Sequence, residues 1–310
     1  MTGGDPAAEL ADSLSPLLFS IAYRMLGSVS DAEDIVQEGF ARYLQARADG
    51  SVVESPKAYL SAVVTRLAID HLRSARVRRE TYIGQWLPEP LLTDTDSEDP
   101  AQHAERADSV SMALLLLLER LGPVERAVYL LHDVFDYDYA EIGEIVGKSP
   151  LNCRQLASRA RRHVEAEKPR FDASSSERDQ LSRRFLAAIT EGDVDDLVTM
   201  LAADVTVVGD GGGKAPQWIN PIRGTVRVAR LLAGIGRIVH KLGGSLRPRE
   251  INGQPGAFVL DANMALIHIL VLEIAGGAVQ TVRSVINPDK LRHLGPLADV
   301  DALMHQTRQQ

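Results

Sequence analysis

The sequence predicts a multidomain protein in which two all-α domains are followed by one α+β domain. The chain has 310 residues, which exceeds the length at which a single hydrophobic core stops growing. Up to about residue 168, apolar residues recur with helical spacing. Beyond that point, helical segments are followed by short apolar runs separated by glycine-containing turns, a pattern typical of strands. Together these observations predict the order of the domains.

The first predicted domain, residues 1–80, contains three helices. Residues 14–25 have apolar side chains at helical spacing, and a second helix is expected to begin with Ser30 as its N-cap and with acids in its first turn. A third helix is expected to begin at Pro56, because proline is favoured at the first helical position, and to continue without a breaker to Arg79.

A linker, residues 81–108, is predicted between the helical domains. It contains the sequence WLPEP, residues 86–90, whose two prolines exclude both a helix and a central strand, and then a run rich in aspartate and glutamate. A spacer needs only polar residues, so the indole of Trp86 beside Leu87 predicts an anchor that docks into a pocket on the third domain. The alternative is that Trp86 packs on the first helical domain.

The second predicted helical domain, residues 109–170, ends in a helix-turn-helix over residues 139–163. Gly147 provides the turn, and Leu151 and Leu156 are expected to face inward. Asn and Gln side chains pair with adenine and Arg with guanine or phosphate, so the outward face is expected to contact DNA. The alternative is a basic amphipathic helix that packs on an acidic partner. The predicted DNA-contacting residues are Ser149, Asn152, Arg154, Gln155, Ser158, Arg159 and Arg162.

The third predicted domain, residues 178–310, follows a serine-rich joint at residues 171–177. An antiparallel meander of strands is expected to pack against helices as an α+β fold and to enclose a cavity. Its predicted helices cover residues 181–201 and 225–242, and its predicted strands cover residues 205–210, 256–262, 265–275 and 278–286.

Charge is distributed unevenly along the chain, whose formal net charge is -8. Residues 66–79 contain five arginines against one acid, and residues 148–162 contain five basic residues and no acid. Two local basic segments predict two discrete nucleic-acid contacts, the alternative being solvated helix faces. The single cysteine, Cys153, excludes an internal disulfide and a metal site built on cysteines. No secretion signal or membrane span is recognisable, so we expect a cytoplasmic protein.

The segments DAEDIVQEGFARYL, residues 31–44, and SPKAYLSAVVTRLAIDHLRSARVRRE, residues 55–80, resemble one region of the extracytoplasmic-function (ECF) sigma factors of the sigma-70 family. In that family this region binds RNA polymerase and recognises the promoter minus-10 element, and a helix-turn-helix contacts the minus-35 element. The resemblance implies polymerase contacts at Asp31, Glu33, Asp34, Gln37 and Glu38. It implies minus-10 contacts at Tyr59, Arg66, Asp70, His71, Arg73, Arg76, Arg78 and Arg79.

Three further motifs resemble the subgroup of these sigma factors that carries a fused SnoaL-like, NTF2-like domain. They are WLPEP in the linker, DGGGK at residues 210–214 and NPDKL at residues 287–291. DGGGK lacks the spacing of a phosphate-binding loop, and its glycines are expected to permit a tight turn or a close backbone approach. The residues to which the resemblance assigns an interdomain regulatory role are Trp86, Leu87, Pro88, Glu89, Pro90, Asp210, Gly211, Gly212, Gly213, Lys214, Asn287, Pro288, Asp289, Lys290 and Leu291.

The resemblance implies an alternative sigma factor that binds core RNA polymerase, contacts promoter DNA as part of the holoenzyme, and is modulated by its own third domain. It implies no separate anti-sigma factor, membrane partner, metal, cofactor or enzymatic activity. The alternative is a DNA-binding regulator whose C-terminal cavity senses or transforms a small molecule, with Asp210, Asp261 or His268 as the candidate general base. For His268, a hydrogen-bonded cavity histidine is favoured over a catalytic one.

Overall fold

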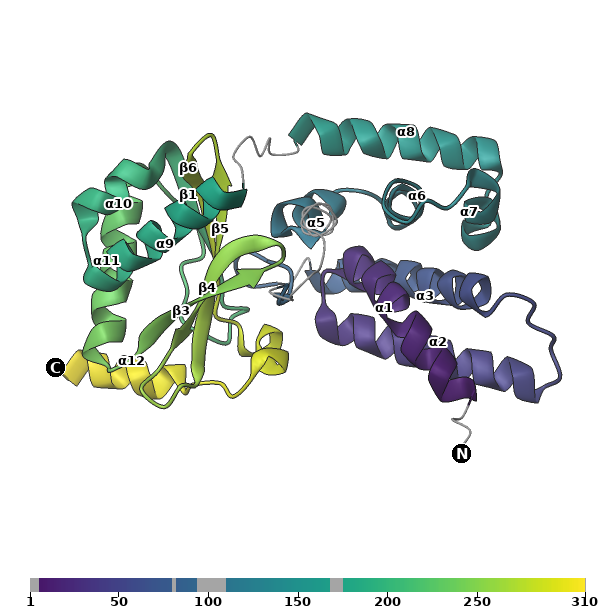
Figure 1. Ribbon diagram of the computed structural model, residues 1–310, viewed down its shortest axis with the longest axis horizontal. Helices are drawn as coiled ribbons and strands as arrows, with labels where there is room; N and C mark the ends of the chain where they lie inside the picture. The colour runs from purple at the N-terminus through teal and green to yellow at the C-terminus, as the bar shows by residue number, and fades with distance from the viewer. Residues whose placement is uncertain (1–5, 80–81, 94–109, 168–174, 310) are drawn as a thin grey trace. The chain divides into compact units, whose positions relative to one another are not determined.

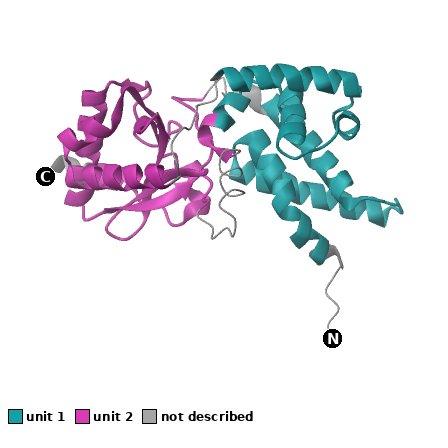
Figure 2. Cartoon of the chain, turned by 45° about the horizontal axis from the view of Figure 1, so that its top comes forward, with its two compact units in different colours: residues 1–80, 114–168 teal, residues 81–113, 169–310 magenta. Residues whose placement is uncertain are grey.

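The computed structural model describes residues 6–79, 82–93, 110–167 and 175–309. The chain divides into two compact units (Figure 2). The first unit comprises residues 1–80 and 114–168, and the second comprises residues 81–113 and 169–310. The segment between the two helical groups therefore belongs to the same unit as the C-terminal domain.

The first unit begins with three helices, α1 (Pro6–Leu26), α2 (Val29–Ala48) and α3 (Pro56–Arg79). The α2 N-cap is Ser28, whose Oγ accepts a hydrogen bond from the backbone N–H of Asp31 at 3.1 Å. The prediction of Ser30 as the cap is therefore wrong. Because the helix starts earlier, only Asp31 of the predicted acids lies in its first turn.

Four further helices follow, α5 (Met112–Leu118), α6 (Pro123–Asp133), α7 (Tyr139–Val146) and α8 (Pro150–Glu167). Gly147 ends α7 in the left-handed conformation with φ 67°, as expected of a glycine at this turn. The buried face of α8 is formed by Cys153, Ala157, Ala160 and Val164, which recur with helical period. Leu151, expected to face inward, is 63% exposed, because α8 is rotated relative to the prediction.

Buried polar contacts join the two helical groups of the first unit. The Arg126 guanidinium donates from Nη1 to the backbone oxygen of Met25 at 2.5 Å, and the Tyr137 hydroxyl donates to Ser61 Oγ at 2.8 Å. A buried donor left without an acceptor is costly, so these contacts fix how the two groups pack.

The second unit contains a six-stranded sheet in the order β2-β1-β6-β5-β4-β3. Its strands are β1 (Leu201–Asp210), β2 (Ile222–Arg223), β3 (Ser245–Ile251), β4 (Gln254–Leu260), β5 (Leu266–Ala275) and β6 (Ala278–Val285). Strands β4 to β6 form the predicted antiparallel meander, and β3 extends it by pairing antiparallel with β4. Strand β1, however, pairs with β6 in parallel. A parallel pair requires a long connection, and here α11 and the strands β3 to β5 lie between the two strands in sequence.

Strand β3 and the short β2 were not predicted. Pro248 lies within β3 and lacks the N–H that a central strand needs, but β3 is an edge strand, where proline is tolerated.

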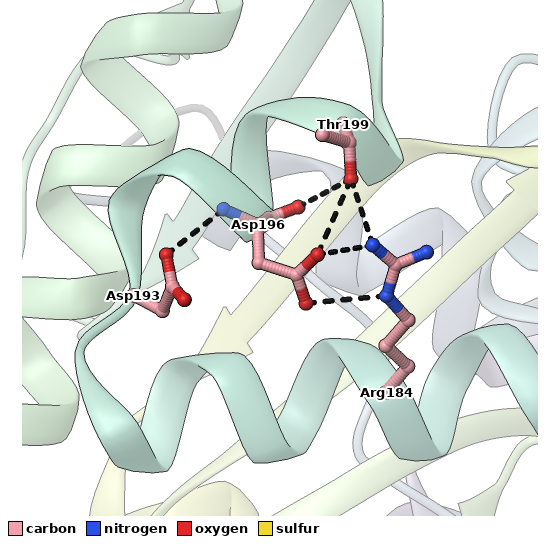
Figure 3. A network of polar contacts seen from close by, with 4 residues as sticks. All are labelled: Arg184, Asp193, Asp196 and Thr199. Atoms are coloured by element: carbon pink, nitrogen blue, oxygen red, sulfur yellow. Dashed lines mark hydrogen bonds and ion pairs between the residues drawn. The ribbon is translucent and has the colours of Figure 1, made fainter.

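Helices α9 (Ser175–Glu191), α10 (Val194–Met200) and α11 (Thr225–Lys241) lie along one face of the sheet (Figure 1). Phe185, Leu232 and Leu270 are buried between the two layers. Figure 3 shows the polar contacts at the α9–α10 corner, where Asp193 caps α10 and Arg184 contacts Asp196 and Thr199. These contacts orient the short α10 before β1.

The chain ends with two short 3-10 turns, η1 (Pro288–Lys290) and η2 (Arg292–Leu294), and with helix α12 (Val300–Gln309), which was not predicted. Helices in the first unit and an α+β second unit agree with the predicted fold class. In the part of the chain that the structure describes, no helix is long and apolar enough to span a membrane.

Candidate functional site

The predicted DNA-contacting face lies on α8. Ser149 Oγ accepts a hydrogen bond from the backbone N–H of Asn152 at 3.2 Å, so Ser149 caps the helix. The Arg154 guanidinium lies 5.3 Å from the centre of the Tyr139 ring, a distance typical of a cation–π contact. The exposed side chains are those of Ser149, Arg154, Gln155, Ser158, Arg159 and Arg162, whereas Asn152 is half-buried.

The predicted minus-10 residues lie on α3 and differ in their surroundings. Asp70 and Arg73 form an exposed ion pair at 3.1 Å, and Tyr59 is half-buried with its ring 6.0 Å from that of Tyr43. His71 Nε2 lies 3.4 Å from Asp31 Oδ2, which brings a predicted DNA contact and a predicted polymerase contact together. Arg76, Arg78 and Arg79 belong to the helix, but their side chains lie outside the described residues.

Arg66 contacts the helix-turn-helix. Its Nε donates to the backbone oxygen of Ile145 at 2.8 Å, and its Nη2 donates to that of Glu144 at 2.7 Å. These carbonyls belong to the last turn of α7, where a cation is favourable because the helix dipole is negative there. These two hydrogen bonds use two of the five N–H donors of the Arg66 guanidinium.

The predicted polymerase-binding residues lie on α2. A groove of 430 Å³ beside them is lined by α1 and α2, including Phe19, Val36 and Gln37. Glu38 forms a 2.7 Å pair with Arg42 on the same helix. Apolar side chains in the groove and acidic ones at its side can contact a partner helix of mixed character. The exposed members of the predicted set are Glu33, Asp34, Gln37 and Glu38, and Asp31 is half-buried.

The second unit contains a cluster of polar groups around Asp210, which ends β1 and has a fully buried side chain. Asp210 Oδ1 accepts a hydrogen bond from the Tyr82 hydroxyl at 2.5 Å, and Oδ2 accepts one from the backbone N–H of Leu87 at 2.8 Å. Both donors belong to the predicted linker. Burial and the neighbouring carboxylate raise the pKa of Tyr82 far above its usual value, so its hydroxyl stays protonated.

Lys290 supplies the charge that balances Asp210. Its Nζ lies 2.7 Å from Asp210 Oδ2 and also donates to the backbone oxygen of Leu87. The same Nζ lies 4.3 Å from the centre of a Trp86 ring and 5.0 Å from that of Tyr82. A buried ammonium is costly unless it is paired, and here a carboxylate, a carbonyl and two aromatic rings surround it.

The glycines of DGGGK permit the linker to approach. A Cβ on Gly212 would lie 2.2 Å from Asn287 Nδ2 and 3.1 Å from the Tyr82 hydroxyl, and a Cβ on Gly213 would lie 2.9 Å from Ile83 Cδ1. Both glycines have positive φ, of 60° and 69°. Close approach therefore requires glycine at position 212, and the positive φ favours glycine at both positions.

The remaining motif residues surround this cluster. Asn287 Nδ2 donates to the Tyr82 hydroxyl at 2.9 Å, and Asp289 pairs with Lys214. His293, beyond the motif, has Nε2 2.7 Å from the backbone oxygen of Pro90. The motif residues buried here are Leu87, Pro88, Glu89, Pro90, Asp210, Gly211, Asn287, Lys290 and Leu291, and those only partly buried are Trp86, Gly212, Pro288 and Asp289.

Asn252 holds the linker at a second place. Asn252 is fully buried in the turn between β3 and β4. Its Oδ1 accepts a hydrogen bond from the Leu91 backbone N–H at 3.0 Å, and its Nδ2 donates one to the Val110 backbone oxygen at 2.8 Å. Leu92 forms an antiparallel bridge with Ile251. One side chain thus binds the chain on both sides of the acidic stretch 94–109, which itself lies outside the described residues.

Comparison with known proteins identifies the family. A model of Sigma-70 region 2 matches residues 10–78, and a model of Sigma-70, region 4 matches residues 111–164. The ECF RNA polymerase sigma factor SigJ of Mycobacterium tuberculosis is 38% identical over 287 residues, which cover 90% of this chain and 91% of SigJ. The chain belongs to the ECF sigma factors.

Two more relatives agree with this ECF assignment. The probable ECF RNA polymerase sigma factor SigI of Mycobacterium tuberculosis is 32% identical over 295 residues, which cover 94% of this chain and 97% of SigI. The crystal structure of SigJ superposes with a TM-score of 0.73 at 34% identity, covering 94% of this chain and all of the SigJ chain. The predicted function is thereby confirmed: the chain is an alternative sigma factor that directs transcription initiation.

In this ECF sigma factor the region 2 match corresponds to α1–α3 and the region 4 match to α5–α8. The likeness of the C-terminal domain to SnoaL-like, NTF2-like folds remains a prediction. Tyr82, Asn252 and His293 are contact residues that the sequence analysis missed. The Asn252-Gly253 pair does indicate a hairpin turn, but nothing in that signal shows that the asparagine side chain binds another segment.

Proposed function

We propose that the C-terminal domain of this ECF sigma factor controls its activity by holding the linker between regions 2 and 4. The observation that carries the proposal is the buried Asp210 carboxylate, which binds Tyr82 and Leu87 of the linker and Lys290 of the C-terminal domain. A docked linker is ordered by these contacts, and releasing it costs their free energy.

The linker matters because it connects the two parts that contact DNA. We propose that α3 and α2 serve the minus-10 element and core RNA polymerase, and that the exposed face of α8 serves the minus-35 element. Two weak DNA contacts become one strong contact only when the linker allows both at the correct spacing. A C-terminal domain that holds residues 82–93 and Val110 therefore acts on promoter binding without contacting DNA itself.

Such control needs no separate anti-sigma factor, because the inhibitory or activating contact is made within the chain. The protein would act in the cytoplasm, where core RNA polymerase and the chromosome are found. We propose no enzymatic activity, since the acids predicted as candidate bases have structural partners. Asp210 binds the linker, and Asp261 Oδ1 accepts the backbone N–H groups of Asn263 and Ala265 at 2.8 Å in the β4–β5 turn.

Transcription reconstituted with core RNA polymerase and a promoter template tests the proposal. Asn252→Ala removes the two side-chain contacts to Leu91 and Val110, and the matched control is Asn263→Ala, an exposed asparagine in the neighbouring turn. We expect Asn252→Ala to change the amount of transcript severalfold at equal sigma concentration and Asn263→Ala to leave it unchanged. Equal transcript from both variants and the parent would contradict control through the linker, while leaving sigma activity itself established.

A further inference from the structure

A cavity of 390 Å³ lies in the second unit, and none of the described residues that line it makes the linker contacts described above. Ile235, Ile238 and Val239 of α11 form one wall, and Leu303 and Met304 of α12 contribute to another. The remaining lining comes from the ends of β5 and β6, from the segment between β1 and β2 that contains Trp218, and from Leu242 and Val300. A volume in the range of roughly 300–1,000 Å³ with mainly apolar walls is typical of small-molecule sites.

The sheet becomes polar where it meets the cavity. Leu270 and Leu272 of β5 pack in the hydrophobic core, whereas His268, which precedes them on the same face, lines the cavity together with Ser284 of β6. Ser284 Oγ lies 3.3 Å from His268 Nδ1, and Gln217 Nε2 donates to Ser284 Oγ at 3.3 Å. Three polar side chains thus converge on one side of an otherwise apolar space.

This polar cluster is uncharged. Burial lowers the pKa of His268 to about 4, so the imidazole is neutral at neutral pH. Among the described residues that line the cavity, none is an acid, a lysine or an arginine. An ionised ligand would lose its hydration here without gaining a counter-charge, which is strongly unfavourable.

We propose that this cavity binds a neutral, largely apolar small molecule whose single carbonyl or hydroxyl group pairs with the His268–Ser284 cluster. The aliphatic walls bind its apolar body and the cluster fixes its orientation, as in other sites that combine apolar walls with few polar groups. The inference concerns binding alone and does not depend on the proposed control of transcription.

The site binds and does not transform its ligand. Of the three candidate bases, His268 lines the cavity, whereas Asp210 and Asp261 are engaged elsewhere. His268 Nδ1 contacts the Ser284 hydroxyl, which accepts a hydrogen bond from the Gln217 amide, and no carboxylate orients His268 among the described residues that line the cavity.

The test uses the full chain without polymerase and the neutral fluorescent ketone prodan, whose emission moves to shorter wavelength in apolar surroundings. We expect saturable binding of one prodan per chain. Displacement is then measured with 2-acetylnaphthalene, which is neutral, and with 2-naphthoate, which has a similar shape but a charge. The ketone should displace prodan at a concentration at least about tenfold lower than the carboxylate.

Two tryptophan substitutions on α11 locate the site. Ile238 lines the cavity and is 43% exposed, so Ile238→Trp obstructs the space from its edge without replacing a core residue. Val226 is 49% exposed on the same helix and does not line the cavity, so Val226→Trp is the matched control. We expect Ile238→Trp to weaken prodan binding at least about tenfold and Val226→Trp to leave it unchanged.

Circular dichroism identifies a variant that fails to fold, and Met304→Trp then obstructs the cavity from α12 instead. Non-saturable prodan binding, equal binding by the cavity variant and the Val226→Trp control, or displacement by 2-naphthoate as strong as by the ketone would each overturn the proposal. Because no promoter or polymerase is present, these outcomes are independent of whether the linker controls transcription.

Discussion

Lys290 and Asp210 form a buried ion pair with 2.7 Å between Nζ and Oδ2. Removing one partner leaves an uncompensated charge, so we expect Asp210→Ala or Lys290→Met to lower the free energy of unfolding of the second unit by about 3–5 kcal/mol. The double variant should lose less than the sum of the two, because the partners are directly coupled. Tryptophan fluorescence during denaturation measures the free energy of unfolding of the second unit, because Trp86 and Trp218 both lie in that unit.

The exposed pair Lys214–Asp289 provides the control for that cycle. Solvent screens this pair, so Lys214→Met should change the free energy of unfolding by no more than about 1 kcal/mol. Additive effects of the two buried substitutions would show that Asp210 and Lys290 do not depend on each other for stability.

Gly212→Ala separates a steric clash from a backbone effect. The new methyl group would meet Asn287 and Tyr82, whereas Gly276, which also has positive φ, has nothing within 4 Å of a built Cβ. Gly276→Ala should therefore lower the free energy of unfolding by only about 1–2 kcal/mol, the penalty for an alanine in the left-handed conformation. Gly212→Ala should lower the free energy of unfolding by more than this, and it should also increase protease cleavage of residues 82–93. Similar cleavage of both variants would argue against a close fit between DGGGK and the linker.

Arg66→Ala removes two hydrogen bonds to the last turn of α7. Hydrogen bonds from charged groups contribute about 1.5–3 kcal/mol each before solvent exposure is considered, so we expect amide hydrogen exchange at the end of α7 to rise severalfold. Arg42→Ala, which removes an exposed pair with Glu38, should leave that exchange unchanged. If exchange in α7 is the same in both variants, the Arg66 contact does not hold α7 in solution.

His268 makes stability depend on pH. Its pKa is near 4 when folded and near the ordinary value of 6.5 when unfolded, so the unfolded chain binds more protons between these values. Stability of the second unit should therefore fall as pH falls from 6.5 towards 4, by up to about 3 kcal/mol from this residue. Denaturation at several pH values should show a shallower dependence in His268→Gln. If stability depends on pH equally in His268→Gln and the parent, folding does not lower the pKa of His268.

Much of the architecture follows from local sequence signals. Proline at position 56, glycine at 147 and serine at 149 mark helix ends through their own backbone preferences, and the structure places helix boundaries there. The parallel pairing of β1 with β6 was not predictable in the same way, because it depends on contacts between segments far apart in the sequence. The choice between Ser28 and Ser30 as the cap of α2 could not be made from residue type, because serine suits the N-cap at either position.

The candidate sites were predicted unequally. The motifs WLPEP, DGGGK and NPDKL correctly indicated segments that meet, since Asp210 and Lys290 both contact Leu87. The partners outside the motifs, Tyr82 and Asn252, have residue types that are common on surfaces, and only the fold brings them to the linker. The assigned roles in binding DNA, polymerase and promoter remain predictions.

Asn252 has a consequence for how this protein tolerates change. Because one asparagine binds both Leu91 and Val110, these two residues are held at nearly the same point although they are far apart in the sequence. Doubling the length of such a closed loop costs only about 0.6 kcal/mol of chain entropy. A change in the number of residues between Leu91 and Val110 among descendants of this gene should therefore cost little in chain entropy while Asn252 holds both ends.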